Sequence, residues 1–387
     1  MTKQPSYRFA GYTEVWKQKK LGEVSEKVRE KNSDNLYSSV LTNSAEFGII
    51  PQRDFFDKDI ANEKNLNGYY IVKHNDFVYN PRISNHAPVG PIKPNKLNEV
   101  GIMSPLYYVF RTHDIENSYL ATYFDTTYWH KFMKINGDSG ARADRFAIKD
   151  SVFVEMPIPI PSLPEQTAIG SFFQDIDQLI SLQQRKLEVL KEKKKTYLKL
   201  LFPAKGQTKP ALRFAGFEDE WTSALLGDIS ELYQPKTISS EELLTEGFPV
   251  FGANGYIGYY KDYNHKEDQV TISARGEGTG TPSFVEGPVW ITGNSMVVNV
   301  EKQANIIKPF LYAFCLSFNF KPFVTGGAQP QLTREVLKKV NIMLPSLPEQ
   351  EAIGSFFQDL DKAIAKQEEK VNQLKESKQT LLRKMFI

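Results

Sequence analysis

The fold is decided by a stretch of 41 residues that occurs twice. The first copy, SLPEQTAIGSFFQDIDQLISLQQRKLEVLKEKKKTYLKLLF, runs from Ser162 to Phe202, and the second, SLPEQEAIGSFFQDLDKAIAKQEEKVNQLKESKQTLLRKMF, runs from Ser346 to Phe386. Aligned without gaps, 24 of the 41 positions are identical. Each copy opens with Ser-Leu-Pro-Glu, which matches the S-x-x-E capping box, and proline is tolerated in the first turn of a helix. The pattern predicts a helix beginning at each Ser-Leu-Pro-Glu.

Both predicted helices are amphipathic, with apolar side chains recurring at alternating spacings of four and three residues. In the first copy this stripe consists of Ile169, Phe173, Ile176, Ile180, Gln183, Leu187, Leu190, Lys194, Tyr197 and Leu201. The spacing is typical of a coiled-coil seam. A helix of about 38 residues is roughly 55 Å long. Because a globular segment lies between the two copies, we expect the helices to pair antiparallel.

Polar residues interrupt the stripe at the same two positions in each copy: Gln183 and Lys194 in the first, Gln367 and Lys378 in the second. Polar residues in such a seam weaken it but specify its register. Gln183 and Gln367 both lie near the middle of their helices, so we expect an antiparallel pair to bring their side chains together. Gly170 and Gly354 also correspond, and we expect each to mark close packing against a globular segment.

A second repeat lies at the start of each half of the chain. RFAGYTEVWKQKKLGEVSE (Arg8 to Glu26) returns as RFAGFEDEWTSALLGDISE (Arg213 to Glu231), with 9 identities in 19 positions. The offset is 205 residues here and 184 for the helices, so the second middle is 21 residues shorter. The two middles hardly match. Uniform drift after a duplication would not leave such similar helices beside such different middles, which favours a division of labour.

The sequence therefore predicts an α+β fold with an internal pseudo-twofold repeat: two globular α/β bodies separated by two long helices that form an antiparallel coiled coil. The boundaries are 1–161 for the first body, 162–202 for its helix, 203–212 for a linker, 213–345 for the second body and 346–387 for the second helix. Strand-like runs include Asp76 to Tyr79 and Gln269 to Arg275. Helix-like runs are expected from Ser118 to about Met133 and from Lys308 to Ser317.

Composition narrows the class of protein. The formal net charge is only +2 over 387 residues, so bulk charge does not hold this chain on nucleic acid. No apolar run approaches the roughly 20 residues of a membrane span, and the N-terminus has no apolar signal-peptide core. The single cysteine, Cys315, fits a reducing compartment and a cytoplasmic location. With five scattered histidines, a metal site is not expected.

Catalytic motifs are weak. The run Gly276-Glu277-Gly278-Thr279-Gly280 resembles a phosphate-binding loop, but Pro282 follows it where a dinucleotide fold would place a helix. Asn80-Pro81-Arg82-Ile83 resembles the Asn-Pro-Pro-aromatic tetrapeptide of amino-methyltransferases, but it lacks the second proline and the aromatic residue. We predict no catalytic residue in this chain, which makes it a non-enzyme.

Polar, basic loops flanked by aromatic residues are the candidate binding elements of the bodies. Arginine reads guanine, and asparagine or glutamine reads adenine, through paired hydrogen bonds in the major groove. Other basic side chains position the DNA backbone. The candidate DNA-binding residues are Asn80, Arg82, Asn85, Lys93, Arg142 and Arg145 in the first body, and Asn254, Tyr256, Lys261, Arg275, Gln329 and Gln331 in the second.

Together these features resemble the DNA-specificity subunit of type I restriction–modification systems. The resemblance rests on the two Ser-Leu-Pro-Glu-Gln helices, the loop from Gly326 to Leu332, and the run from Phe251 to Tyr260. It implies that each body is a target-recognition domain reading one half of a bipartite, asymmetric site in double-stranded DNA. It implies that the helices are the spacer, on which two modification subunits dock.

The resemblance also implies where the chemistry lies. The modification subunits carry S-adenosylmethionine and methylate adenine, and restriction subunits, which translocate and cleave DNA, use ATP and Mg. This chain itself binds no cofactor. Two other hypotheses remain open from the sequence: a stand-alone DNA methyltransferase or nuclease, and a coiled-coil scaffold that never touches DNA. No membrane partner is expected.

Overall fold

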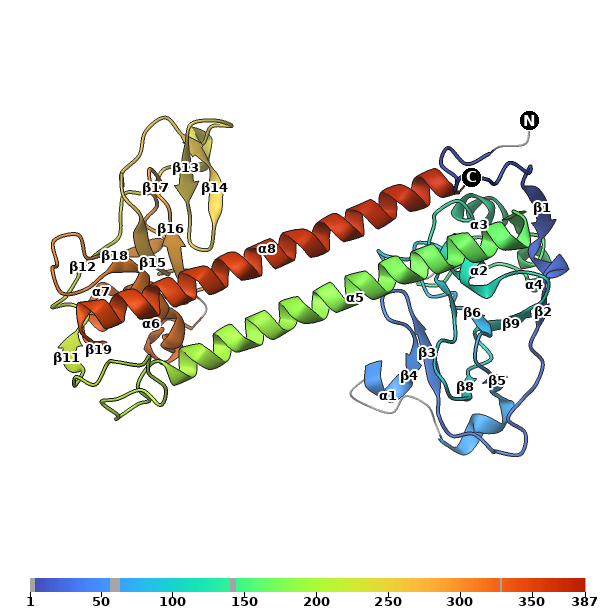
Figure 1. The fold of residues 1–387 in the computed structure, drawn as a ribbon, viewed down its shortest axis with the longest axis horizontal. Coiled ribbons are helices and arrows are strands. Elements are labelled where there is room, and N and C mark those ends of the chain that lie inside the picture. The colour runs from blue at the N-terminus through green and yellow to red at the C-terminus, as the bar shows by residue number, and fades with distance from the viewer. Residues whose placement is uncertain (1–3, 56–62, 140–143, 328, 387) are drawn as a thin grey trace. The chain divides into compact units, whose positions relative to one another are not determined.

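The computed structural model describes residues 4–55, 63–139, 144–327 and 329–386. The chain divides into two compact units (Figure 1): unit 1 contains residues 1–182 and 370–387, and unit 2 contains residues 183–369. Each unit therefore combines one body with a section of both long helices. The mixture of helices and sheets agrees with the predicted α+β class. Among the described residues, no helix is long and apolar enough to cross a membrane.

The two long helices begin and end close to the predicted positions. Helix α5 spans Leu163–Leu200 and α8 spans Leu347–Met385. In each unit their sections run side by side in opposite directions (Figure 1), which confirms the antiparallel pairing. In unit 2 the Gln367 side chain donates from Nε2 to the Oε1 and the backbone oxygen of Gln183, at 3.0 and 2.9 Å. The two glutamines meet as their matching positions predict.

The rest of unit 1 consists of short strands and helices. They are β1 (Lys17–Lys20), β2 (Ser25–Lys27), β3 (Leu41–Ser44), β4 (Gly48–Pro51), α1 (Gln52–Phe55), β5 (Tyr70–Val72), β6 (Phe77–Tyr79), β7 (Ile92–Pro94), β8 (Gly101–Met103), β9 (Tyr108–Thr112), α2 (Asn117–Phe124), α3 (His130–Asn136), α4 (Asp150–Phe153) and β10 (Pro157–Ile160), with 3₁₀ turns at Leu21–Glu23 and Glu63–Gly68. The single helix expected from Ser118 to Met133 is wrong: the chain leaves the helix at Asp125 and re-enters it at His130.

Unit 2 has a corresponding set. It contains β11 (Thr222–Leu225), β12 (Glu231–Tyr233), β13 (Phe248–Phe251), β14 (Tyr256–Tyr260), β15 (Gln269–Ser273), β16 (Pro282–Val285), β17 (Trp290–Ile291), β18 (Ser295–Asn299), α6 (Lys308–Ser317), α7 (Arg334–Leu337) and β19 (Asn341–Leu344), with 3₁₀ turns at Ser240–Glu242 and Lys321–Phe323. Helix α6 has the predicted bounds.

The two bodies share a central antiparallel sheet although their sequences diverge. Its strand order is β2-β9-β6-β7 in unit 1 and β12-β18-β15-β16 in unit 2. A separate two-stranded sheet joins the start of each body to the strand before its long helix, β1 with β10 and β11 with β19. Unit 1 adds the pairs β3–β4 and β5–β8, and unit 2 adds the sheet β14-β13-β17. The additions are where the bodies differ most.

The glutamate of each Ser-Leu-Pro-Glu motif lies at the junction of body and helix. Glu165 and Glu349 are both about 1% exposed. Glu165 accepts hydrogen bonds from Arg8 Nε at 2.8 Å, from Arg8 Nη2 at 2.6 Å and from Trp16 Nε1 at 3.1 Å. Glu349 is bound in the same way by Arg213 and Trp221. Their carboxylates therefore clamp the first repeated segment to the helix instead of closing the predicted capping box.

The glutamine that follows this glutamate binds backbone groups of the body. Gln166 accepts from the backbone N–H of Glu116, the residue before α2, at 2.9 Å, and donates to the Pro161 carbonyl at 3.0 Å. Gln350 makes the matching bonds to Ile307 N, before α6, and to the Pro345 carbonyl. A buried amide side chain thus satisfies backbone groups that a helix start leaves open.

The repeat also extends to the ends of the chain. The backbone N–H of Tyr7 donates to the Lys384 carbonyl at 3.0 Å, and that of Leu212 donates to the Leu200 carbonyl at 2.9 Å. These residues correspond pairwise in the two repeats. In unit 1 the hydrogen bond therefore joins segments near the two ends of the chain, whereas in unit 2 the same bond closes the loop from α5 to the second body.

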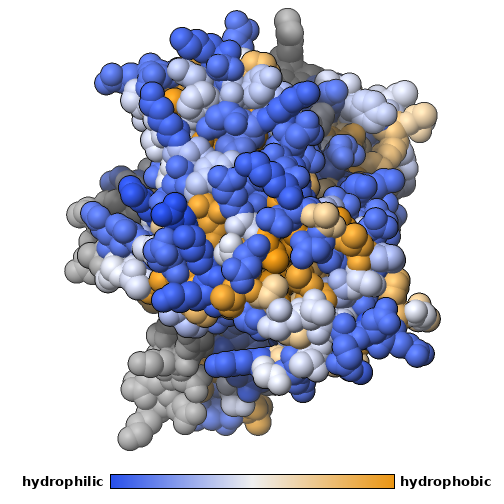
Figure 2. All heavy atoms as spheres, turned by 90° about the vertical axis from the view of Figure 1, so that its left-hand side faces the viewer, coloured by the Kyte–Doolittle hydropathy of each residue, from blue (hydrophilic) through white to orange (hydrophobic). Residues whose placement is uncertain are grey.

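One face of unit 2 is mostly hydrophilic. Figure 2 shows its face at the left of Figure 1, where hydrophobic side chains gather in the middle and hydrophilic ones surround them. The exposed large hydrophobic residues of this unit include Leu225 on β11 and Leu347 at the start of α8. The core proper lies beneath, where α6 packs on β15 and β16 together with Phe202 and Phe357 from the long helices.

We predict that Glu349→Ala destabilises unit 2 by about 3–5 kcal/mol, because it leaves the Arg213 guanidinium without its buried partner. Urea unfolding followed by circular dichroism measures the change. Glu351→Ala is the matched control, because Glu351 lies two residues further along α8 and is exposed. A loss no larger than that of the control would contradict the structural role of the clamp.

Glycine in α8 gives a second prediction. A Cβ added at Gly354 would lie 2.8 Å from Pro309 Cβ and 3.0 Å from the Phe310 nitrogen. Alanine favours a helix by about 1 kcal/mol over glycine. We nevertheless expect Gly354→Ala to lower the free energy of unfolding by about 1–3 kcal/mol, because backbone and proline cannot move aside as a flexible side chain can. An increase in the free energy of unfolding would show that α6 moves to accommodate the added methyl group.

Candidate nucleic-acid interface

In unit 2, the structure gathers several predicted residues at the end of the central strand β15. Arg275 follows this strand and pairs with Gln331 in an antiparallel bridge. Beside this bridge the Leu332 N–H donates to the Ala274 carbonyl at 3.0 Å. Gln331 and Thr325 also exchange backbone hydrogen bonds at 2.9 and 2.8 Å. The backbone is thus fixed on both sides, while the side chains of Arg275 and Gln331 remain exposed.

Two further loops complete this cluster. The turn between β13 and β14 carries Asn254, whose side chain contacts Gly278: a Cβ added at that glycine would lie 2.6 Å from Asn254 Cγ. The Thr279 hydroxyl donates to the Pro330 carbonyl at 3.2 Å. An open hollow between the loops is lined by Arg275, Gly276, Glu277, Gly327, Gln329, Pro330 and Gln331. Four predicted residues, Asn254, Arg275, Gln329 and Gln331, therefore share one surface.

In unit 1, Arg82 and Arg145 come together although 62 residues separate them. They form an antiparallel bridge, flanked by hydrogen bonds from Phe146 N to the Pro81 carbonyl at 2.7 Å and from Ile83 N to the Asp144 carbonyl at 2.9 Å. Both arginines are exposed, as is Asn85 in the following turn. This pair is the counterpart in unit 1 of the bridge between Arg275 and Gln331.

Asn80 and Lys93 have other partners. Asn80 Nδ2 donates to the Asn43 carbonyl at 2.8 Å, and its Oδ1 accepts from Arg82 N at 3.0 Å, so its side chain supports the loop that carries Arg82. Lys93 donates to Asp125 at 2.5 Å. Its ammonium is therefore occupied within unit 1.

The remaining predicted residues lie apart from these pairs. Tyr256 is 56% exposed on β14, and its ring packs edge-on against Phe251. Lys261 lies over the Tyr260 ring, with Nζ 5.9 Å from the ring centre. Arg142 falls outside the described residues. No group of histidine, cysteine, aspartate or glutamate within the described ranges has the geometry to hold a metal ion.

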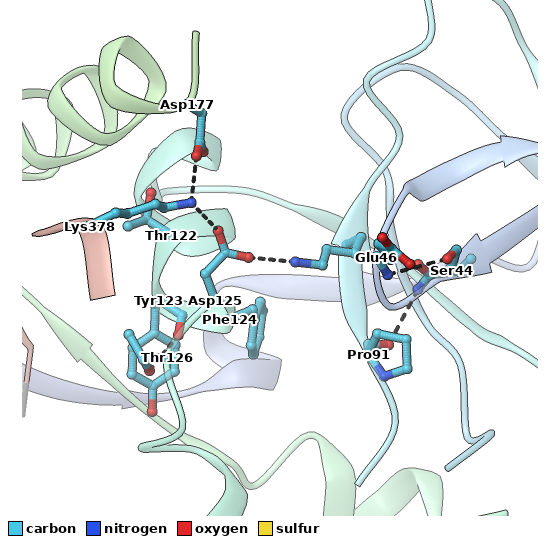
Figure 3. Close-up of polar contacts among 12 residues, drawn as sticks. Ser44, Glu46, Pro91, Thr122, Tyr123, Phe124, Asp125, Thr126, Asp177 and Lys378 are labelled. Carbon is cyan, nitrogen blue, oxygen red and sulfur yellow. Dashed lines mark hydrogen bonds and ion pairs between the residues drawn. The ribbon is translucent and has the colours of Figure 1, made fainter. Parts of the chain in front are cut away.

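A charged network connects the first body to the helix pair within unit 1. Lys378 on α8 donates to Asp177 on α5 at 2.6 Å and to Asp125 after α2 at 3.3 Å. Figure 3 shows Lys378 between the carboxylates of Asp177 and Asp125. The other oxygen of Asp125, Oδ1, accepts the hydrogen bond from Lys93. In unit 2, the matching Lys194 binds Asp361 at 2.5 Å, and Leu316 lies nearby where unit 1 has Asp125. Among the residues that the structure describes, only those of unit 1 thus link this helix lysine to its body by charge.

The network shifts the pKa values of its members. Burial alone would raise the pKa of Asp125, but Lys93 and Lys378 hold it below its ordinary value. Burial would lower the pKa of Lys378, but Asp125 and Asp177 raise it. The resulting stabilisation is therefore present at neutral pH. It is lost as the pH falls through the lowered pKa of Asp125 or rises through the raised pKa of Lys378.

The sequence pattern does not predict the carboxylates of these contacts. It indicates a capping role for Glu165 and Glu349 and no role for Asp177 and Asp361, although each pair is identical in the two copies. That identity was the available signal. No signal in the sequence pointed to Asp125, which has no charged counterpart in unit 2.

With this geometry in place, comparison with known proteins identifies the family. The sequence model of the type I restriction modification DNA specificity domain matches residues 13–192 and again residues 218–376. These two matches cover most of the chain and correspond to the two repeats. The chain belongs to this family.

Several specificity subunits are related in sequence. A putative type I specificity subunit of Mycoplasma pneumoniae is 23% identical over 84% of this chain and 80% of its own length. The EcoprrI specificity subunit of Escherichia coli is 25% identical over 39% of this chain, and the MjaVIII specificity subunit of Methanocaldococcus jannaschii is 23% identical over 61%. These two alignments span 38% and 62% of the relatives' lengths.

Solved structures show the same fold. The S subunit of a type I restriction–modification system from Mycoplasma genitalium matches with a TM-score of 0.66 at 16% identity, over 100% of this chain and 99% of that one. A chain from a study of complex assembly and conformational transition in a type I system matches with a TM-score of 0.55, also at 16% identity, over 98% and 99%.

The two helix lysines allow a direct prediction. Lys378→Met should cost about 3 kcal/mol of unfolding free energy, because it removes the shared cation between two carboxylates. Lys194→Met should cost about 1 kcal/mol or less, since the carboxylate that it binds, that of Asp361, is partly exposed. Urea unfolding of both variants at neutral pH measures the difference. Equal losses would mean that Asp125 contributes nothing to the network.

Proposed function

We propose that this chain is the DNA-reading subunit of a type I restriction–modification enzyme, and that it binds double-stranded DNA at a bipartite, asymmetric site with one half-site for each body. The observation that carries the proposal is the contrast between the repeats. The helices and their Glu-Gln junctions are nearly identical, whereas the exposed polar clusters lie on divergent sequence. Identical junctions serve a shared task, and divergent clusters serve two different targets.

The proposal extends to partners. Two modification subunits would dock on the two similar helix sections, because a repeated surface offers two like binding sites. They would bring S-adenosylmethionine and methylate adenine, and restriction subunits with ATP and Mg would translocate and cleave. Catalysis would therefore reside on partner chains. A low net charge of +2 fits such an assembly, in which partners supply much of the phosphate binding.

Loops that are anchored on a rigid sheet are suited to the recognition of DNA bases. Base edges in the major groove are distinguished by paired hydrogen bonds from arginine, asparagine and glutamine. The clusters in both units offer these side chains from backbone held by bridges on the central sheet. The net charge offers little bulk attraction to phosphate, so sequence preference would come from these local groups.

The test is to co-express the chain with its modification partner in a host lacking other DNA methyltransferases and to map methylated adenines by single-molecule sequencing. We expect methylation at one bipartite motif, and none when the chain is expressed alone. Replacing residues 1–161 by the corresponding body of a relative should change one half of the motif only. Methyl transfer by the chain alone, or simultaneous change of both halves, would contradict the proposal.

A further inference from the structure

Both bodies present one pair of exposed side chains on the same backbone frame. In unit 1 the pair is Arg82 and Arg145, and in unit 2 it is Arg275 and Gln331. Each arginine follows the strand in the third position of its sheet, β6 or β15. In unit 1 the Phe146 N–H donates to the carbonyl of Pro81, the residue before Arg82. In unit 2 the Leu332 N–H donates to the carbonyl of Ala274, the residue before Arg275. The frames therefore correspond although the loops share no sequence pattern.

The bridge geometry places the two side chains of each pair close together on one face. In an antiparallel pairing flanked by hydrogen bonds in this way, the two opposed residues have their Cβ atoms about 4.5–5.5 Å apart. Neighbouring bases along one strand of B-DNA are about 3.4 Å apart. Two such side chains can therefore reach two adjacent base pairs from a single rigid platform.

The electrostatics of the pairs point to a ligand. Among the described residues, no hydrogen bond or ion pair engages the guanidinium groups of Arg82, Arg145 or Arg275. Like charges directly opposite one another in a sheet are destabilising. Two adjacent arginines without a carboxylate partner therefore form a site for an acceptor-rich ligand. Guanine offers such a surface through O6 and N7.

A nearby carboxylate in unit 2 distinguishes a base edge from a phosphate. Glu277 lines the same hollow as Arg275 and Gln331. A carboxylate repels phosphate, whereas it can accept a hydrogen bond from the cytosine amino group. The mixture of donors and acceptors thus suits the edges of base pairs better than it suits the backbone.

From these observations we infer that the two pairs are the base-reading elements of the bodies. Arg82 and Arg145 select guanine at two positions of one half-site, and Arg275 and Gln331 select guanine and adenine in the other. This inference rests on the proposed function and adds to it the specificity-determining residues and the base class that each recognises.

The experiment uses the full chain with its modification partner and reads the methylated motif by single-molecule sequencing. Arg275→Ala should relax one position of one half-site, with a loss of discrimination of roughly 5- to 150-fold, and leave the other half-site unchanged. Gln331→Ala should relax a second position in that same half-site. Arg82→Ala and Arg145→Ala should act on the other half-site in the same way.

Arg275→Lys separates base reading from phosphate contact. Lysine keeps the charge but loses the two-pronged hydrogen bonding of the guanidinium, so a base-reading role predicts a relaxed position and a phosphate role predicts an unchanged motif. The Arg275→Lys variant also tests the inference if Arg275→Ala fails to fold. Arg334→Lys is the matched control, the same substitution at an exposed arginine of unit 2 that lies on α7 and pairs with Glu335.

The outcomes are distinct. If the unaltered chain directs methylation to a bipartite motif and Arg275→Lys keeps every base preference, the inference fails while the proposed function stands. A uniform loss of methylation at all sequences, with the motif intact, would also overturn it. If the unaltered chain confers no motif with its partner, the proposed function itself fails.

Discussion

The buried carboxylates of Glu165 and Glu349 are the constraint on which the rest of the structure depends. Each lies in the first turn of a long helix and receives hydrogen bonds from the arginine and tryptophan of the first repeated segment. An unpaired carboxylate in that position would be strongly unfavourable, so the helix start and the start of the body must come together. Body and helix are thereby held in one defined relation in each unit.

This constraint explains why the bodies can diverge. The junction uses only the first segment, the Glu-Gln pair and a glycine, and none of these lies in the reading loops. The backbone hydrogen bonds that hold the loops after β6 and β15 do not involve the side chains of the four reading residues. Sequence change at Arg82, Arg145, Arg275 or Gln331 therefore need not disturb the junction, and specificity can change while assembly is retained.

The helix pair itself is not symmetric in its attachments. Lys194 and Lys378 each bind the matching aspartate of the opposite helix, but within the described ranges only Lys378 also reaches a carboxylate of its body. Asp125 occupies the end of α2, where the expected long helix is interrupted. The interruption that the helix pattern did not predict is therefore where unit 1 gains an additional link to its spacer.

Periodicity and repetition in the sequence alone determined the two long helices, their antiparallel pairing, the contact between Gln183 and Gln367 and the boundaries of α6, because these depend on local spacing or on the repeat itself. The residue types of the reading loops were also visible. Only the tertiary structure decided which of them share a surface: Arg82 meets Arg145, and Arg275 meets Gln331, across long stretches of chain. It likewise turned Asn80 and Lys93 toward partners within unit 1. Such pairings depend on the register between strands that are distant in the sequence, and this register cannot be predicted from the spacing of residues along the chain.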